Sequence, residues 1–496
     1  MSKHTPSKYQ AAVYHFITDG SGNAVVDAVA GSGKSTTIVN ALNLIPEDKS
    51  VLFLAFNKAI VEELKIKVGM LPNVDVKTLH SLGISSIKEF MRADTNADKY
   101  KLFVNISIKN NTISPLMSLD GSDFKEWRQN IIALIDLLRV NLVELGDESA
   151  ALDIAAKHGL YLQDNEITIA FKAISWGLNN ESSIDFTDML YFPIMKNIRM
   201  PKYDFVFIDE CQDLNAAQRE LFLRCLKPDG RFIAVGDPRQ AIYGFAGADV
   251  KSFNILKNLP DTVSMPLSVC YRCDRVIIDL AKTLVPQIEC RENAATGTVN
   301  KEDSIGNVRD GDMILCRLTA PLVEVCMQYI YSGVKAFVKG RDIGANLVNM
   351  IKNTNREQMV DVFDKFDKEL AKIQIKCAKD TGCSISEAKE HENYIRYQDK
   401  VDAIRYLSHD LNWASETISR INTIFSDKAQ GICLSTIHKS KGLEADRVFI
   451  LAPETMYHER AMRIDWMAEQ EANLVYVAYT RAKHYLGFIT DYEIKK

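Results

Sequence analysis

The chain lacks the features that mark membrane, secreted and disordered proteins. It has no run of about 18 apolar residues, so no membrane-spanning helix is expected. Residues 1–10 are polar and lack the apolar core of a secretory signal. No long proline- or glycine-rich tract occurs, and 47% apolar beside 25% charged residues is the composition of a folded protein. We therefore expect a soluble intracellular protein of the cytoplasm or nucleoid.

Cysteine spacing and net charge exclude two further classes. The ten cysteines are scattered without the spacing of a disulfide framework, which is typical of reduced thiols inside a cell. Cys270 and Cys273 form a CxxC pair, but no second pair follows at zinc-site spacing, so a metal site there is not favoured. A net charge of -5 excludes a generally basic nucleic-acid coat. A local basic groove is compatible with this net charge, because salt screens the field of each charged patch beyond about 10 Å.

A length of 496 residues predicts more than one domain. Two regions alternate short apolar runs with amphipathic helices, which favours parallel sheets covered on both faces, the α/β class. The expected strands are 24–29, 51–56, 205–208, 232–235, 313–316, 334–338, 432–435 and 448–451. The expected organisation is lobe 1 in 1–88 and 184–262 with an insert in 89–183, then lobe 2 in 263–345 and 428–496 with an insert in 346–427.

Both inserts carry apolar stripes at helical spacing. The first stripe, at 4,3,4,4 spacing, consists of Trp127, Ile131, Leu134, Leu138 and Leu142. The second, at 4,3,4,3 spacing, consists of Met359, Phe363, Phe366, Leu370 and Ile373. The first predicts a packed helix. The second predicts a helical bundle or short coiled hairpin, with a partner-binding helix as the alternative.

A glycine-rich turn follows the first expected strand, in "DAVAGSGKSTT" at 27–37, before an expected helix at 36–42. The phosphate-loop pattern has Gly where Ala28 stands, but the following residues fit it. Gly31 and Gly33 let backbone N–H groups surround phosphate oxygens, Lys34 supplies charge, and Ser35 can bind Mg²⁺. The residues expected to line the phosphates are Ala30, Gly31, Ser32, Gly33, Lys34, Ser35 and Thr36. The turn predicts ATP and Mg²⁺ as cofactors; a chance strand-to-helix turn is the alternative.

Two acids end a later apolar strand, in "YDFVFIDECQD" at 203–213. This places Asp209 and Glu210 at the carboxyl edge of the sheet, where α/β proteins bind ligands. We expect Asp209 to hold the metal ion and Glu210 to orient or deprotonate the attacking water. Ordinary acids at a helix start are the alternative, which the upstream phosphate loop disfavours.

A third strand end, "GDPRQAIYGFAGAD" at 236–249, combines an amide with aromatic rings. Gln240 can hydrogen-bond the γ-phosphate or the attacking water. Tyr243 and Phe245 can stack on bases, and Phe56, after the second strand, offers another ring. Core packing is the alternative for such rings. One loop could thus sense hydrolysis and shift a base-stacking surface.

The chain contains, in order, the motifs "AGSGKST", "FLAFNKAIVEEL", "VKTLHSLG", "IDFTDML", "VFIDECQD", "VGDPRQAIYGFAGAD", "YRC", "STIHKSKGLEADRVFIL" and "VYVAYTRAKHYL". This set resembles superfamily 1 DNA helicases of the UvrD/Rep type and covers both sheet regions but not the inserts. "FLAFNKA", "CRLTAPLVEV" and "VKGRDIG" are most similar to the compact branch that includes the F-box DNA helicases. The resemblance implies two RecA-like P-loop lobes with ATP between them.

The resemblance also implies roles around the nucleotide. Gln10 resembles the glutamine that reads adenine, and Tyr271 the tyrosine that stacks on it. Arg272 and Arg481 resemble two arginine fingers that reach the γ-phosphate, a contact worth about 10³ to 10⁵ in rate elsewhere. Glu444 resembles the glutamate that contacts the ribose. These residues would make hydrolysis depend on lobe closure.

Two Thr-x-His units follow strand ends, one in each region. Thr78 and His80, like Thr436 and His438, stand where relatives touch the backbone of the single strand. For an isolated histidine, a structural role is the more common alternative. Their repetition in both regions favours a symmetric pair of phosphate contacts.

The chain departs from the family at several positions. Relatives usually have Arg where Ala246 stands and Asn where Cys270 stands, and a Thr-Asn pair at Leu318 and Thr319. Loss of the arginine puts coupling or DNA affinity at that point in doubt. The second insert is shorter than in long UvrD-type enzymes, so substrate preferences that depend on it are not carried over.

These observations predict an ATP-dependent DNA helicase or translocase that moves along single-stranded DNA, by family analogy from 3′ to 5′. ATP would close the lobes and hydrolysis would open them. Two alternatives stay open: a translocase that strips proteins or recombinase filaments with little unwinding, and a nucleotide-gated clamp with negligible turnover. The expected partners are single-stranded, tailed or forked DNA and replication or recombination proteins, without a membrane, and the expected state is a monomer. Stacking and phosphate contacts do not distinguish DNA from RNA, nor replication from repair or recombination.

Overall fold

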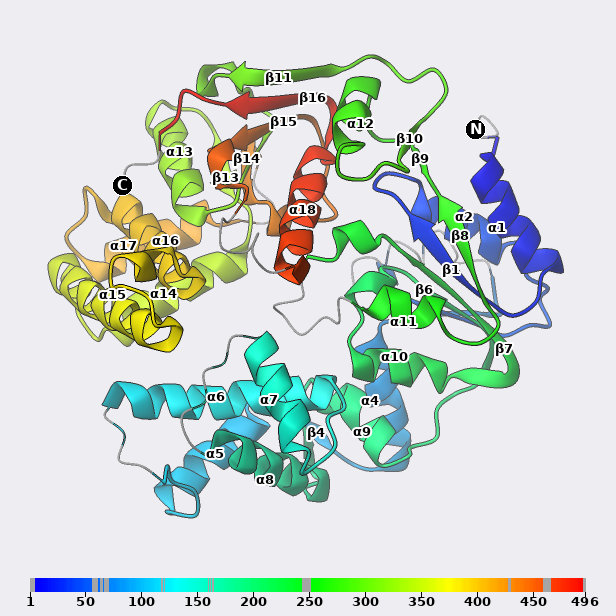
Figure 1. Ribbon diagram of the computed structural model, residues 1–496, viewed down its shortest axis with the longest axis horizontal. Coiled ribbons are helices and arrows are strands. Elements are labelled where there is room, and N and C mark those ends of the chain that lie inside the picture. Colours follow the sequence, from blue (N-terminus) through cyan, green and yellow to red (C-terminus); the bar gives the residue numbers. More distant parts are fainter. Residues whose placement is uncertain are drawn as a thin grey trace. The chain divides into compact units, whose positions relative to one another are not determined.

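The protein folds into two compact units, each built on its own sheet. The structure, a computed structural model, describes all residues except 1–4, 56–60, 63–65, 67–70, 117–118, 120, 159, 161, 163–164, 243–250, 427–429, 458–464 and 494–496. The first unit comprises Met1–Val29 and Gly33–Ser268, and the second comprises Ala30–Ser32 and Val269–Lys496. Each contains a six-stranded parallel sheet with covering helices (Figure 1). The α/β class with two parallel-sheet lobes expected from the sequence is confirmed.

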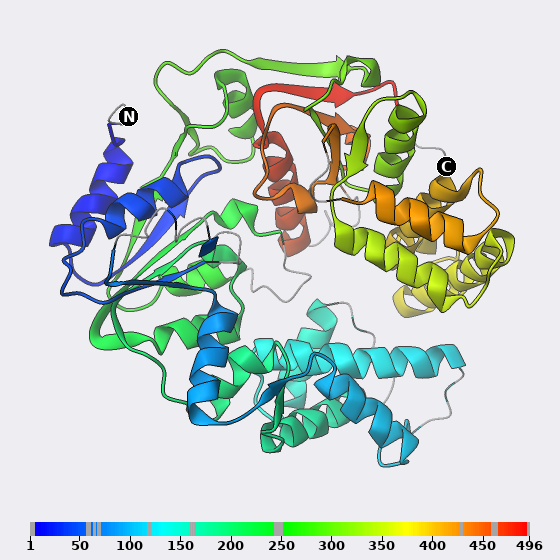
Figure 2. The same ribbon diagram turned by 180° about the vertical axis from the view of Figure 1, so that it is seen from behind.

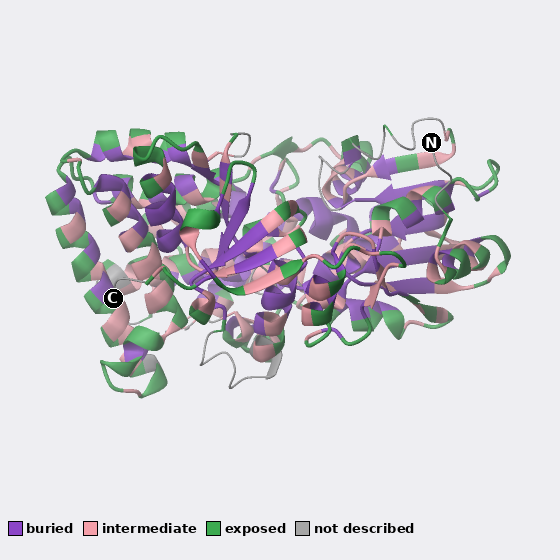
Figure 3. Ribbon diagram, turned by 90° about the horizontal axis from the view of Figure 1, so that it is seen from above, coloured by how far each residue is buried: buried purple, intermediate pink, exposed green. Residues whose placement is uncertain are grey.

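The sheet of the first unit is covered by helices on both faces. In spatial order its strands are β3 (Val74–Lys77), β2 (Val51–Leu54), β6 (Tyr203–Ile208), β7 (Leu226–Gly236), β1 (Asn23–Ala28) and β8 (Thr262–Leu267). One face packs on α1 (Lys8–Asp19) and α2 (Lys34–Leu42), the other on α4 (Leu79–Phe90), α9 (Asp188–Met195), α10 (Ala216–Leu223) and α11 (Ser252–Lys257). Within β1, Val26 faces the first layer and Val25 the second. Burial on both faces explains the continuous apolar runs of the central strands, and most strand segments in Figure 3 are accordingly coloured as buried.

The helical insert of the first unit confirms a helix at the predicted apolar stripe but ends it earlier. Its helices are α5 (Lys99–Lys109), α6 (Gly121–Val140), α7 (Glu148–Lys157) and α8 (Glu166–Asn179), beside the short strands β4 (Asp94–Thr95) and β5 (Ser183–Ile184). Trp127 and Leu138 on α6 are fully buried. Leu142 was expected to continue the stripe, but α6 ends at Val140 and Leu142 has a left-handed backbone with φ 55°. Its side chain still packs against the same core from the turn.

A buried charge network fixes the insert to the motif "IDFTDML". Nη1 of Arg139 donates to Asp188 at 2.7 Å, and Nη2 donates to Asp185 at 2.8 Å. Nζ of Lys99 reaches the other oxygen of Asp188 at 2.8 Å. All four side chains are nearly or fully buried, so each charge depends on its partner. The two acids of this motif therefore have a structural function.

The second unit repeats the layered architecture. Its strands in spatial order are β11 (Thr298–Asp303), β16 (Ala482–Ile489), β15 (Ala445–Leu451), β12 (Met313–Cys316), β14 (Ile432–Thr436) and β13 (Ala336–Val338). A separate two-stranded sheet pairs β9 (Val269–Cys270) with β10 (Glu289–Cys290). The helices are α12 (Arg275–Ala281), α13 (Thr319–Tyr331), α14 (Arg341–Asn353), α15 (Met359–Thr381), α16 (Glu392–Ser408), α17 (Ala414–Ile424) and α18 (Asp465–Tyr479). Helices α12 and α18 pack on β16.

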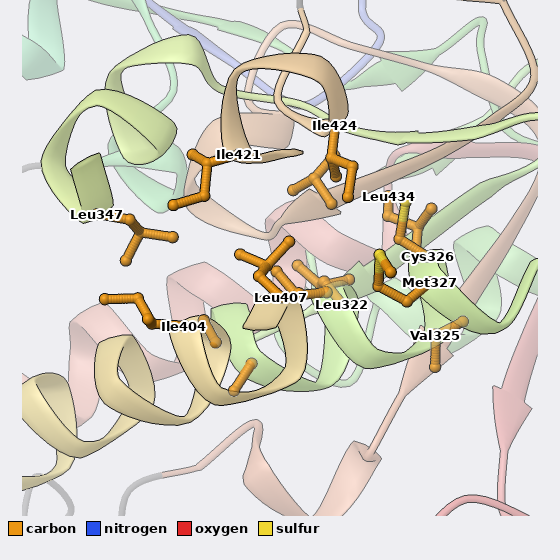
Figure 4. Close-up of a cluster of buried hydrophobic side chains, with 14 of the residues drawn as sticks. Leu322, Val325, Cys326, Met327, Leu347, Ile404, Leu407, Ile421, Ile424 and Leu434 are labelled. Atoms are coloured by element: carbon orange, nitrogen blue, oxygen red, sulfur yellow. The ribbon is translucent and has the colours of Figure 1, made fainter. Parts of the chain in front are cut away.

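Helices α14 to α17 form the second insert and share their core with the sheet. Figure 2 shows them gathered, in yellow to orange, at one end of this unit. In the close-up, Leu347, Ile404, Leu407 and Ile421 converge from α14, α16 and α17 (Figure 4). The predicted stripe lies on α15, where Phe366 and its neighbours in the stripe pack into the same core. The apolar stripe of α15 thus packs inside the helical bundle of the second insert. No helix among the described residues has the length and apolarity that crossing a bilayer requires.

Candidate functional site

The turn between β1 and α2 has the backbone of an anion-binding loop. Gly31 and Gly33 adopt left-handed conformations with φ 66° and 77°, which glycine reaches without steric cost. Gly33 precedes α2, which begins at Lys34, two residues before the expected start at Thr36. The first N–H groups of a helix have no partner within the helix and favour an anion. The exposed hydroxyl of Ser35 lies in this first turn.

Ser32 adds an independent sign that this loop fits a phosphate. Its hydroxyl is buried and has no hydrogen-bond partner among the described residues. Buried polar atoms are normally paired. A phosphate oxygen is an acceptor that this hydroxyl can satisfy, so the loop residues present fit a triphosphate.

Lys34 contacts the acids after β6. Its Nζ lies 3.4 Å from both carboxylate oxygens of Glu210. Burial alone would lower the pKa of Lys34, but the charges of Glu210, Asp209 and Asp237 outweigh burial and raise it. The ammonium group therefore stays charged. The structure thus brings together the cation of the loop and the two adjacent acids that follow β6.

The acids also fit a metal that is shared with a phosphate. The described part of the chain contains no group of three or more His, Cys, Asp or Glu side chains able to hold a metal ion. Mg²⁺ commonly takes only one or two protein oxygens and completes its shell with water and substrate phosphates. Asp209 at the end of β6 and the Ser35 hydroxyl are oxygen donors of this kind. The oxygen donors present therefore fit Mg²⁺ bound together with a nucleotide.

Gln240 is held at the end of β7. It lies in the turn Pro238–Gln240, is nearly buried, and donates from Nε2 to Oδ2 of Asp237 at 2.8 Å. Arg239 forms two hydrogen bonds to Asp27, at 2.6 and 3.2 Å. Burial raises the pKa of Asp237 although Arg239 and Lys34 oppose the shift. The amide predicted to sense the γ-phosphate is thus fixed by a buried acid on the same loop.

Gln212 belongs to the site but sequence reasoning gave it no role. Its Nε2 donates to Oε2 of Glu210 at 2.6 Å, and its Oε1 accepts from the Asp237 backbone N–H at 3.0 Å. Gln212 belongs to the motif "VFIDECQD", so the sequence contained a signal for this residue. Its partner Asp237 lies at the end of the neighbouring strand β7, and the motif alone does not show that the two residues meet.

Gln10 lies behind the phosphate loop. Its Oε1 accepts from the Ser7 backbone N–H at 3.0 Å in a capping box, and its Nε2 donates to Oγ1 of Thr37 at 3.0 Å. Thr37 in turn donates to the carbonyl oxygen of Gly33 at 2.9 Å. This chain of hydrogen bonds connects α1 to the start of α2. The adenine-reading role of Gln10 stays a prediction.

In the second unit, one predicted arginine finger contacts the predicted ribose glutamate. Nε of Arg272 lies 2.7 Å from Oε2 of Glu444, and Nζ of Lys483 lies 3.2 Å from Oε1. Partial burial would raise the pKa of Glu444, but Arg272 and Lys483 together hold it below its usual value. Nη1 of Arg272 also donates to the carbonyl oxygen of Thr480 at 3.1 Å. Tyr271, beside the arginine, accepts a hydrogen bond from Arg291 at its carbonyl oxygen.

Arg481 has different surroundings from Arg272. It is only 1% exposed, and its Nε and Nη1 donate to the carbonyl oxygens of Val477 at 3.0 Å and Leu443 at 2.9 Å. These bonds connect the end of α18 with the segment before β15. Arg481 thus has a structural role within its unit, whatever it contributes to hydrolysis.

The two Thr-x-His units both lie at strand ends. Thr78 follows β3 and caps α4, where its Oγ1 accepts from the Ser81 backbone N–H at 3.1 Å. Thr436 ends β14, and its Oγ1 accepts from the Lys439 backbone N–H at 3.4 Å. Their roles in binding a strand stay predictions. Sequence reasoning did not anticipate that Thr78 is a helix cap.

The two histidines are both disposed to be neutral. Burial lowers the pKa of His80. Burial lowers that of His438 further, to about 3, with help from Arg317, Arg396 and Lys439. A neutral imidazole can donate one hydrogen bond to a phosphate but brings no charge. These two residues would therefore contribute hydrogen bonds rather than ion pairs.

Four positions to which the sequence gave a role, Phe56, Tyr243, Phe245 and Ala246, lie outside the described residues.

At Leu318 and Thr319, where relatives have a Thr-Asn pair, a residue of α16 caps the start of α13. The Asp399 carboxylate accepts from the backbone N–H groups of Thr319 at 2.9 Å and Ala320 at 2.8 Å. The second insert thus holds the start of α13.

Known proteins are similar to this chain in both of its units. A model of the UvrD/REP helicase N-terminal domain matches residues 8–261, and a model of the UvrD-like helicase C-terminal domain matches residues 431–489. F-box DNA helicase 1 of Gallus gallus is 23% identical over 494 residues, which cover 92% of this chain and 46% of that protein. F-box DNA helicase protein 1 of Schizosaccharomyces pombe is 23% identical over 501 residues, covering 92% and 54%. ATP-dependent DNA helicase PcrA of Staphylococcus aureus is 23% identical over 306 residues, covering 56% and 40%. The chain spans about half the length of the two F-box helicases.

Proposed function

Because the chain belongs to the UvrD/REP helicase family, we propose that it is an ATP-driven motor that moves along single-stranded DNA from 3′ to 5′ and separates duplex strands. One observation carries the proposal. Lys34, the first residue of α2, lies 3.4 Å from Glu210 after β6, with Asp209 beside it. A cation, a general base and a metal-binding carboxylate at one sheet edge are the groups that phosphoryl transfer requires.

The loop between β1 and α2, together with the strand ends of the first unit, supplies the groups that bind and cleave the triphosphate. The N–H groups from Gly31 to Lys34 surround the phosphates, and Lys34 neutralises charge on the β and γ groups. Asp209 and Ser35 would hold Mg²⁺, which would withdraw charge from the phosphate oxygens. Glu210 accepts a proton from the attacking water. Gln240 then reports the presence of the γ-phosphate.

The second unit supplies cations that complete the site on closure. Arg272 stands 2.7 Å from Glu444, so a γ-phosphate must compete with this acid for the guanidinium group. Once Arg272 has moved, Lys483 still holds Glu444, whose free oxygen can accept a hydrogen bond from the ribose. Arg481 is the second finger, and Tyr271 stacks on the adenine. Hydrolysis then depends on both units, which couples it to motion.

The strand is gripped by both units in turn. Thr78 and His80 on the first unit and Thr436 and His438 on the second bind backbone phosphates, and aromatic rings stack on bases. Stacking is worth about 1 to 3 kcal/mol per base and tolerates any sequence, which suits a motor that repeats one step. A nucleotide-gated clamp would not need a base, a metal ligand and two fingers together.

The test measures ATP hydrolysis and strand separation by the full chain on DNA and RNA duplexes with a 3′ or a 5′ tail. We expect hydrolysis to be stimulated by single-stranded DNA, and unwinding of the 3′-tailed DNA duplex. Stimulated hydrolysis with filament displacement but no unwinding would make the chain a translocase. Nucleotide binding without hydrolysis would make it a clamp and overturn the proposal.

A further inference from the structure

Gln212 is buried between two strand ends and uses both ends of its amide. The residue is 1% exposed and lies in the turn Cys211–Asp213 that follows Glu210. Its Nε2 donates to Oε2 of Glu210 at 2.6 Å, and its Oε1 accepts from the Asp237 backbone N–H at 3.0 Å. The function proposed above gives Gln212 no role.

Glu210 needs such support because its backbone is strained. It adopts φ 53° and ψ 42°, the left-handed region that residues with a Cβ rarely enter. Such conformations cost about 1 to 3 kcal/mol and persist where the surroundings determine them. Here Gln212 donates to one carboxylate oxygen, and Lys34 lies 3.4 Å from both oxygens. These two donors fix the direction of the carboxylate.

The other end of the amide lies against the loop of Gln240. A Cβ at Gly236 would lie 2.4 Å from Oε1 of Gln212 and 2.8 Å from Sγ of Cys211. Only glycine therefore permits the amide to approach the end of β7. The next residue, Asp237, is fully buried and accepts from Gln240 at 2.8 Å. Gln212 thus lies between the proposed base and the acid that fixes the proposed γ-phosphate sensor.

We propose that Gln212 is a positioning residue that holds Glu210 for catalysis and connects it to the loop of Gln240. This inference rests on the proposed function. In hydrolysis, the water oxygen bonds to the γ-phosphorus, the bond from phosphorus to the β,γ-bridging oxygen of ADP breaks, and the water proton passes to Glu210.

The experiment compares three variants of the full chain. Gln212→Glu keeps the oxygen that accepts from Asp237 but loses the donor to Glu210. Gln212→Leu loses both of these contacts and also the longer hydrogen bond from Nε2 to Oδ2 of Asp213 at 3.3 Å. Gln218→Leu is the matched control, because its Oε1 accepts only at the start of α10, from the Asn215 backbone N–H at 2.9 Å. We measure kcat for ATP with and without single-stranded DNA, the Kd of a fluorescent ATP analogue, and thermal unfolding.

We expect Gln212→Glu to lower kcat by about 10- to 100-fold, since a displaced base loses part of a contribution of about 10² to 10⁴. The Kd of the analogue should change much less than kcat, because no phosphate contact is removed, although the added carboxylate lies near Glu210 and Lys34. Gln218→Leu should lower the unfolding temperature but leave kcat unchanged. Unchanged kcat in Gln212→Glu, or a parallel loss of nucleotide binding, would overturn the inference.

A double-mutant cycle tests the coupling to Gln240. If the two amides act through Asp237, the kcat losses of Gln212→Glu and Gln240→Leu will not multiply in the double variant. Losses that multiply would reject the coupling. If Gln212→Leu fails to fold, the kcat of Gln212→Glu still tests whether Gln212 positions Glu210. A wild-type chain without ATP hydrolysis would refute the proposed function, whereas wild-type hydrolysis equalled by Gln212→Glu refutes this inference alone.

Discussion

Each unit has cations beside an acid, at the carboxyl edge of the sheet in the first unit and at the amino ends of β15 and β16 in the second, but their surroundings differ. In the first unit the cation Lys34 lies 3.4 Å from Glu210, an acid with its own proposed role in hydrolysis. In the second unit Arg272 pairs with Glu444 at 2.7 Å, and Arg481 is buried on carbonyl oxygens. In the proposed function, the first edge binds the reacting phosphate, whereas in the second unit a triphosphate would compete with Glu444 for Arg272.

Removal of Lys34 should have the largest effect. Lys34→Ala leaves Glu210 without its cation and the phosphates without their charge partner, so turnover should fall by about 10³-fold or more. The measurement is ATP hydrolysis in the presence of single-stranded DNA. Lys49→Ala, an exposed lysine of the same unit, should keep wild-type turnover. Near-normal hydrolysis by Lys34→Ala would remove the nucleotide site from the first edge.

The two arginines of the second unit should differ in their effects on hydrolysis and on stability when each is replaced by alanine. Arg272→Ala removes a partly exposed cation and should lower kcat by about 10²- to 10³-fold, with little change in unfolding temperature. Arg481→Ala removes the charged hydrogen bonds to the carbonyl oxygens of Val477 and Leu443 and should also destabilise the fold, by about 1.5 to 3 kcal/mol per lost charged hydrogen bond. Hydrolysis assays and chemical unfolding of both variants measure the contrast. Equal stability of the two variants would contradict it.

His438 and His80 should contribute differently to the pH dependence of the unfolding free energy. The pKa of His438 lies at about 3 in the folded state and 6.5 unperturbed, so between pH 6.5 and 5 only the unfolded chain binds the proton. Stability is therefore lost as pH falls, by about 2 kcal/mol over this interval. His438→Gln should remove that part of the slope in urea unfolding at several pH values. His80→Gln should remove less, because burial alone lowers its pKa. A steeper slope in His438→Gln would show that the imidazole is charged in the fold.

Sequence patterns predicted the interior strands except β16, and the edge strand β13, but missed the edge strands β3, β8 and β11. The expected strand at 313–316 coincides with β12, and that at 205–208 lies within β6, because both are buried on both faces and appear as uninterrupted apolar runs. The edge strand β3, Val74–Lys77, alternates apolar with polar residues, and β8 is half exposed, so neither gives a continuous run. The early end of α6 depends on a left-handed residue, Leu142, that is not a glycine.

The same distinction holds for the candidate site. Lys34 and Glu210 were recognisable because each stands at a fixed distance from a strand end. The bond between Gln212 and Asp237 was not, because it depends on the parallel register of β6 and β7, in which Ile208 pairs with Ala234. The contact of Arg272 with Glu444 likewise joins segments far apart in the chain. Motifs thus predict the groups, while pairing between strands and segments decides which groups meet.

The smallest expected effect distinguishes the two Thr-x-His units. Thr78→Ala removes the cap of α4 and should cost about 1 kcal/mol in unfolding free energy, whereas Thr436→Ala loses only a long hydrogen bond of 3.4 Å. If both residues bind the strand, both variants will weaken the binding of a labelled oligonucleotide similarly, as measured by fluorescence anisotropy. Asn215→Ala, which removes the cap of α10, should lower stability without changing the affinity for the oligonucleotide. Unchanged affinity in Thr78→Ala would show that this residue is a helix cap alone. The two Thr-x-His units would then be similar in sequence but not in function.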